Sequence, residues 1–136
     1  MSSKNVVVFG STGFQGLPQV RELLRRNYSV RAVSRHPSAF ATAEFSGVEA
    51  VSADYEDYGS LNRALEGMDA MLFQAPAMGD PTRLMHHCQN LIDATLRSGI
   101  RLVVINSSMG APDTPCGDMV YDGVAAMETL ITDSGL

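Results

Sequence analysis

Three glycines, spaced three residues apart, separate an apolar run from a helical pattern near the start of the chain. Val6 to Phe9 is uninterrupted and apolar, as expected of a buried parallel strand, and it stops at Gly10. The turn that follows reads Gly10-Ser11-Thr12-Gly13-Phe14-Gln15-Gly16 and opens a helical pattern. The N–H groups at such a helix start receive phosphate groups. The context therefore predicts a phosphate-binding turn of a dinucleotide-binding fold.

Each glycine of this turn has an expected role. Gly10 permits the tight turn off the strand, Gly13 lets the backbone approach a pyrophosphate, and Gly16 lets the helix lie against the sheet. A mononucleotide P-loop is excluded because no Gly-Lys-Ser/Thr follows. The alternative interpretation is an ordinary strand-to-helix turn. We expect the whole turn to contact the cofactor, namely Gly10, Ser11, Thr12, Gly13, Phe14, Gln15 and Gly16.

Short apolar runs alternate with helical patterns along the rest of the chain. Strands are expected at 6–9, 29–33, 48–52, 70–74 and 101–105, and helices at 17–26, 61–65, 82–98 and 120–134. This alternation predicts an α/β fold, a doubly wound parallel sheet in the order 3-2-1-4-5 with helices on both faces. The 136 residues correspond to one domain, and 45% hydrophobic residues suit a globular core.

The residues after the second strand distinguish between the two nicotinamide cofactors. An acidic residue there would accept the ribose 2′-hydroxyl of NAD(H), whereas a cation would meet the 2′-phosphate of NADP(H). The sequence reads Ser34-Arg35-His36, so Arg35 favours NADP(H) over NAD(H). The alternative is a solvated surface arginine.

Two further positions are expected to line the cofactor. Asp54 and Tyr55 follow the third strand, where they would touch the adenine edge, although an Asp at a strand exit is also a common turn residue. Gln74 and Ala75 end the fourth strand at the point where the strand order reverses, and their backbone is expected to line the cofactor.

The chain resembles the atypical short-chain dehydrogenase/reductase group that includes NmrA-like proteins and the type-2 NADPH quinone oxidoreductases. The resemblance is carried by Val7 to Gly16, Val30 to Arg35, Ala53 to Asp57, Ser60-Leu61, Ala64-Leu65, Asn106 to Ser108, Met127-Glu128, Leu130 and Asp133 to Leu136. Resemblance to the quinone reductase branch rests on Asp54-Tyr55 and on Ala111 to Pro115. Because members of this group continue into a substrate-binding region, residues 1–136 would be the cofactor half, lacking that carboxyl-terminal region.

Dehydrogenases of this group carry a Tyr-x-x-x-Lys pair on the last helix, and this chain lacks the pair. Tyr121 is followed four residues later by Ala125, and Val124 stands where related NmrA-like proteins have lysine. Candidate catalytic residues are therefore Ser107, Ser108 and Tyr121. The serines are equally suited to capping the following turn, and Tyr121 to packing on an amphipathic helix.

The resemblance implies an NADPH-dependent oxidoreductase that passes hydride directly to a quinone or another small carbonyl compound. The alternatives are a non-catalytic NAD(P)-sensing regulator of the NmrA type, and a repurposed non-redox enzyme or scaffold. A small-molecule substrate is expected, and a homo-oligomer or a regulatory protein partner is compatible with these functions.

Composition excludes several other partners. The formal charge of −5 argues against direct nucleic-acid or anionic-membrane binding, and apolar runs are too short to span a membrane. Cys88 and Cys116 form no disulfide framework, which favours a reducing compartment: the cytoplasm, or the nucleus for a regulator. No metal site is expected, because the adjacent His86 and His87 would diverge on a helix.

Overall fold

A single parallel sheet forms the centre of the molecule. The computed structural model describes residues 4–74, 80–107 and 113–136. Within these residues the strands are β1 (Asn5–Phe9), β2 (Ser29–Val33), β3 (Val48–Val51), β4 (Ala70–Gln74) and β5 (Leu102–Asn106). All neighbouring strands run parallel in the order β3-β2-β1-β4-β5. This confirms the predicted doubly wound order 3-2-1-4-5.

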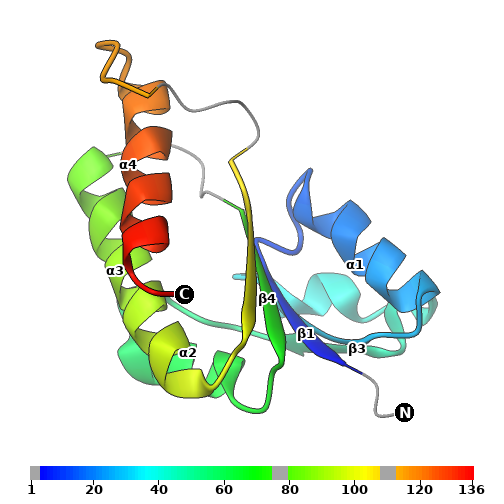
Figure 1. Cartoon of the computed structure of the whole chain (residues 1–136). Helices are drawn as coiled ribbons and strands as arrows, with labels where there is room; N and C mark the ends of the chain where they lie inside the picture. Colours follow the sequence, from blue (N-terminus) through cyan, green and yellow to red (C-terminus); the bar gives the residue numbers. More distant parts are fainter. Residues whose placement is uncertain (1–3, 75–79, 108–112) are drawn as a thin grey trace.

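Helices cover both faces of the sheet (Figure 1). On one face lies α1 (Gly16–Arg25), and on the other lie α2 (Tyr58–Leu65), α3 (Pro81–Ser98) and α4 (Met119–Asp133). Because all five strands run parallel, their carboxyl ends lie at the same edge of the sheet. The residues that follow the strands therefore gather there.

Two short 3-10 helices, η1 (Pro37–Phe40) and η2 (Ala43–Phe45), were not expected from the sequence. They lie between β2 and β3 and bury two phenylalanines, whose rings meet edge to face at 5.1 Å. Phe40 and Phe45 join Val20 of α1 in one hydrophobic cluster. This segment therefore extends the cover that α1 gives to its face of the sheet.

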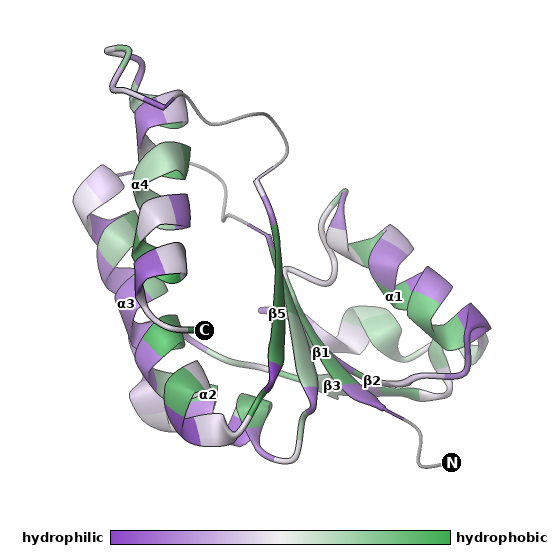
Figure 2. Ribbon diagram, viewed as in Figure 1, coloured by the Kyte–Doolittle hydropathy of each residue, from purple (hydrophilic) through white to green (hydrophobic). Residues whose placement is uncertain are grey.

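Successive strand residues point to opposite faces of the sheet, where they form two separate hydrophobic cores. On the α1 face, Val6, Val8 and Ala32 are almost fully buried; on the opposite face, Val7, Phe9 and Phe73 pack against α2, α3 and α4. Figure 2 shows the middle of the sheet as mostly hydrophobic, whereas the helices carry both hydrophobic and hydrophilic residues. Burial of both faces explains why the β1 segment is apolar at every position from Val6 to Phe9.

Arg31 of β2 fastens the end of α2 to the sheet. Its side chain is 14% exposed, its Nε lies 2.8 Å from Glu49, and its Nη1 donates to the carbonyls of Ala64 and Glu66 at 3.0 and 2.8 Å. These carbonyls belong to the last turn of α2, which has no further helical N–H to bind. Arg31 therefore caps α2 from a neighbouring strand.

No helix in the described ranges combines the length and the apolar character that crossing a membrane requires.

Candidate cofactor site

The glycine turn adopts the geometry that its spacing predicts. Gly10 has a φ of 63°, in the left-handed region, and the Gly13 N–H donates to the Gly10 carbonyl at 3.0 Å. A Cβ on Gly16 would lie only 2.1 Å from the Gly10 oxygen and 2.9 Å from the Ser11 Cα. Both obstacles are backbone atoms, so no side-chain rotation would relieve the clash. Gly16 thus allows α1 to begin directly against the end of β1.

The start of α1 differs from those of the other three α-helices in the described part of the chain. Asp57, Asp80 and Asp118 cap α2, α3 and α4, each accepting a backbone N–H in the first turn. At α1 the N-cap residue is Gln15, whose side chain makes no such bond, and the first turn holds no acidic residue. A helix start without a side-chain acceptor keeps its N–H groups and its partial positive charge available to an anion.

Hydrogen bonds join the glycine turn to the end of β2. Ser11 is fully buried, and its N–H and Oγ both donate to the Val33 carbonyl, at 3.3 and 2.7 Å. The Thr12 and Ser34 hydroxyl oxygens lie 3.1 Å apart. These bonds bring the turn next to Arg35, which is exposed and has no hydrogen-bond or ion-pair partner in the described part of the chain. Arg35 therefore directly follows the residues that join β2 to the glycine turn, and its contact with a 2′-phosphate stays a prediction.

Phe14 is the most exposed large hydrophobic residue of the described ranges. It lies within the glycine turn with 98% of its surface exposed. Because Phe14 belongs to this turn, its ring would lie beside any anion bound at the start of α1.

Asp54 takes part in the turn after β3. Its Oδ1 accepts the Glu56 N–H at 2.9 Å, and its own N–H donates to the Ser60 hydroxyl. This is the turn role that the sequence left open for an Asp at a strand exit, and it leaves the carboxylate exposed at the sheet edge.

The Tyr55 ring turns inward, toward the core below the sheet edge. It packs beside Phe9 and Phe73, and His87 of α3 stacks on it with centroids 5.4 Å apart. Asn90 also binds the Tyr55 carbonyl at 2.8 Å. Burial, with a smaller contribution from the Cys88 thiolate, raises the pKa of the Tyr55 phenol well above its usual range. Tyr55 is thus an uncharged group at the sheet edge, and its contact with an adenine stays a prediction.

His87 and Asn90 are supports that the sequence did not predict. His87 Nε2 lies 3.2 Å from the Glu56 carboxylate, and Arg83 lies 3.1 Å from the same oxygen. Spacing alone puts these α3 residues on one helix face, but no pattern indicates that this face meets the turn after β3. With them, α3 fixes the segment that carries Asp54 and Tyr55.

Gln74 ends β4 beside the glycine turn. Its side chain is buried, and a Cβ on Gly10 would lie 3.9 Å from the Gln74 Cβ. The prediction that Gln74 lies at the crevice between β1 and β4 is therefore consistent with its position. Ala75, the other residue expected there, lies outside the described residues.

The candidate catalytic residues lie beyond β5. Ser107 follows the strand and is half-buried, and Tyr121 lies in the first turn of α4 with 37% of its surface exposed. Ser108 lies outside the described residues. The chain's single lysine is Lys4, which precedes β1. No lysine therefore accompanies Tyr121, and a Tyr-Lys pair is absent from the whole sequence.

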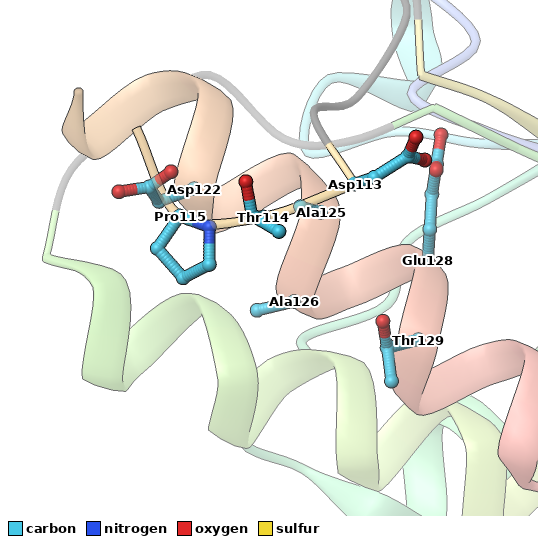
Figure 3. A pocket seen from close by; sticks show the side chains of 8 residues that line it. All are labelled: Asp113, Thr114, Pro115, Asp122, Ala125, Ala126, Glu128 and Thr129. Atoms are coloured by element: carbon cyan, nitrogen blue, oxygen red, sulfur yellow. The ribbon is translucent and has the colours of Figure 1, made fainter. Parts of the chain in front are cut away.

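A hollow of about 380 Å³ lies between α4 and the loop before it (Figure 3). The carboxylates of Asp113, Asp122 and Glu128 line it, and those of Asp113 and Glu128 turn toward one another. Backbone N–H groups of Cys116 and Gly117 lower the pKa of the Asp122 carboxyl, which keeps it charged. Because three carboxylates repel phosphate, this hollow is unsuited to a pyrophosphate, unlike the start of α1.

Within the described residues, no three His, Cys, Asp or Glu side chains are arranged to hold a metal ion. Cys88 is buried in the core and Cys116 is exposed, and both thiols are free.

The sheet order, the glycine turn and the uncapped start of α1 define a doubly wound dinucleotide-binding domain. A family model described as NAD(P)H-binding matches residues 10–136, which is almost the whole chain. The chain belongs to this NAD(P)H-binding family, and its resemblance to NmrA-like proteins and quinone oxidoreductases is confirmed by the relatives below.

Curated relatives match over most of this chain but under half of their own length. Cinnamoyl-CoA reductase 1 of Petunia hybrida is 31% identical over 123 residues, covering 82% of this chain and 37% of the relative. An NmrA-like family domain-containing oxidoreductase of Penicillium ochrochloron is 28% identical over 124 residues, covering 84% and 37%. Quinone oxidoreductase 2 of Escherichia coli is 24% identical over 133 residues, covering 96% and 45%.

Solved structures share the fold. The Citrobacter triphenylmethane reductase complexed with NADP(H) superposes with a TM-score of 0.78 at 23% identity, over 96% of this chain and 46% of that one. The NADPH-dependent quinone oxidoreductase of Escherichia coli complexed with NADPH gives 0.75 at 22% identity, over 96% and 46%. This chain thus spans rather less than half the length of these relatives.

Proposed function

We propose that this chain binds NADP(H) at the glycine turn and acts as the cofactor-binding part of an NADPH-dependent oxidoreductase. The observation that carries the proposal is the uncapped start of α1, since the other three α-helices of the described ranges each have an Asp cap. The residues present fit a dinucleotide. Gly16 removes the Cβ that would push α1 off the turn, and Arg35, which has no partner among the described residues, directly follows Ser34, whose hydroxyl meets Thr12 of the turn.

Each part of the site has a separate task in binding. The N–H groups of Phe14, Gln15 and Gly16 would hold the pyrophosphate, since the Gly13 N–H already donates to the Gly10 carbonyl. Arg35 would pair with the 2′-phosphate, which NAD(H) lacks, and this contact supports NADP(H) as the preferred cofactor. The end of β4 would position the nicotinamide over the crevice.

The acceptor that we propose is a quinone or another small carbonyl compound. The nicotinamide supplies the hydride when bound, and a quinone oxygen takes its proton from water, so no protein acid is needed. This chemistry suits a chain in which Ala125 stands four residues after Tyr121 and the single lysine lies before β1. A quinone oxidoreductase among the relatives supports an acceptor of this kind.

Anaerobic incubation of the chain with NADPH and a panel of benzoquinones and naphthoquinones tests this proposal. Loss of absorbance at the NADPH band, faster than without protein and with hydroquinone formed in equal amount, is expected. An Arg35→Ser variant should favour NADH relative to the wild type. Oxidation no faster than without protein, at saturating NADPH, would exclude reductase activity for this chain.

A second candidate is a non-catalytic sensor of the NADP(H) pool. The observation that favours it is the missing Tyr-Lys pair, because binding without turnover needs no catalytic acid. Calorimetry with NADPH and NADP⁺ separates the two functions. A sensor should bind one redox form much more tightly and show no turnover, whereas a reductase should turn over each acceptor that it binds.

A further inference from the structure

Gln74 ends β4 with a buried carboxamide that is only half satisfied. The residue is 9% exposed, and its Nε2 donates to Gln19 Oε1 of α1 at 2.7 Å. Its own Oε1 is closed to solvent and accepts no hydrogen bond from the described residues. A buried carbonyl oxygen without a donor destabilises the structure that contains it. Such an acceptor at a ligand-binding edge suggests a donor that arrives with the ligand.

The place of this oxygen matches the path expected for a dinucleotide. Gln74 stands beside Gly10, where the β1 strand gives way to the glycine turn, and its Cα is in register with Asn106 of β5. In doubly wound sheets the strand order reverses between the first and fourth strands, and ligands bind there across the carboxyl ends. Gln74 is therefore on the β4 side of the crevice, and Arg35 follows β2 on the other side.

This arrangement assigns the two halves of the cofactor to opposite sides of the glycine turn. With the 2′-phosphate of the adenosine half at Arg35 and the pyrophosphate at α1, the nicotinamide half extends toward β4. The uncharged donors of that half are the ribose hydroxyls and the carboxamide NH₂.

We infer that Gln74 Oε1 accepts a hydrogen bond from the nicotinamide half of the bound cofactor, with Gln19 as the positioning residue. The inference rests on the proposed function. Because Gln19 engages Nε2, the oxygen is the end of the Gln74 amide that remains for a ligand. Since Oε1 is closed to solvent, the cofactor reaches it by displacing neighbouring groups, and the new hydrogen bond offsets that displacement.

The test uses Gln74→Met, which keeps an unbranched side chain of similar length and removes both polar atoms. The dissociation constant for NADPH is expected to rise about tenfold, the scale of one lost hydrogen bond. That for 2′,5′-ADP, which has no nicotinamide half, should stay within about twofold of the wild type. The melting temperature without ligand should not fall, because the substitution also removes the unmatched acceptor.

Two further variants test whether the loss of affinity is specific to the Gln74 side chain. Gln89→Met makes the same change at an exposed residue of α3, whose one hydrogen-bond partner among the described residues is Asp93. It should leave both dissociation constants unchanged. Gln19→Met frees the Gln74 amide to rotate and should weaken NADPH binding by a smaller factor than Gln74→Met.

The 3-acetylpyridine analogue of NADP⁺ lacks the carboxamide NH₂. If Gln74→Met weakens binding of NADP⁺ but not of this analogue, the donor is the carboxamide; equal weakening indicates a ribose hydroxyl.

Two results would overturn the inference: unchanged NADPH affinity in Gln74→Met, or an equal loss for NADPH and 2′,5′-ADP. Failure of the wild type to bind either ligand would instead remove the proposed function, and this inference with it. Binding of 2′,5′-ADP and NADPH with equal affinity in the wild type would leave the site intact but rule out a contact with the nicotinamide half.

Discussion

Gly16→Ala is the substitution with the clearest expected effect. The added Cβ would lie 2.1 Å from the Gly10 oxygen, more than 1 Å closer than an ordinary carbon–oxygen contact of about 3.3 Å. The Gly10 carbon and the Ser11 Cα are also within 3 Å of it, so backbone must move. Overpacking of this kind costs about 1–3 kcal/mol. A shift of α1 by about 1 Å would lengthen its hydrogen bonds to a phosphate beyond their ordinary range. NADPH affinity should therefore fall by at least about tenfold.

Calorimetry and thermal melting of Gly16→Ala measure both effects. Gly47→Ala is the matched control, since its Cβ would meet only Leu24 Cδ2 at an ordinary 3.7 Å. Gly47→Ala should change the melting temperature by no more than a few degrees, and it should leave the affinity for NADPH unchanged. If Gly16→Ala bound NADPH and melted like the wild type, the close packing of α1 on the turn would not be required for the site.

Three other predictions concern the fold and the site edge. Arg31→Met should destabilise the chain by about 3 kcal/mol in urea unfolding, since the last carbonyls of α2 lose their donor; an unchanged midpoint would contradict this. His87 and Arg83 lower the pKa of the Glu56 carboxyl below its usual 4.5. The ionised Glu56 carboxylate should therefore stabilise the fold above pH 4.5, and this stabilisation should disappear as the pH falls through the pKa of the folded state. Glu56→Gln should therefore be less stable than the wild type at pH 6 and equally stable at the acid end, and parallel curves would refute this. Phe14→Trp introduces the only tryptophan of the chain, and NADPH should quench its emission with the calorimetric dissociation constant; constant emission despite calorimetric binding would place the cofactor elsewhere.

Local sequence patterns predicted the strands to within one residue at each end. β1 is one residue longer than expected, and β5 begins at Leu102 because the Arg101 N–H binds the Asp69 carbonyl before strand pairing starts. The helix expected at 61–65 begins earlier, at Tyr58, because the Asp57 side chain caps its start even though Gly59 in the first turn is a weak helix former. Buried strands and capped helices can thus be predicted from short stretches of sequence.

The connections between distant segments were not predictable in this way. Gln74 meets Gln19, and His87 stacks on Tyr55, only because the sheet order brings their elements together. Neither contact has a periodic or compositional signature. The segment from Pro37 to Phe45 likewise lacks helical spacing, and its two 3-10 turns depend on burying Phe40 and Phe45 beneath α1. Sequence therefore located the turn that would bind phosphate, and packing located the side chains that support it.

An NMR titration of the ¹⁵N-labelled chain with NADPH locates the bound cofactor, because it reports on each backbone N–H. We expect the largest shifts on Gly13, Phe14, Gln15 and Gly16, with a second group at Arg35 and the end of β4. The N–H groups around Asp113 and Glu128 in the acidic hollow should not respond. No shifts at millimolar NADPH, or shifts confined to that hollow, would contradict cofactor binding at the glycine turn.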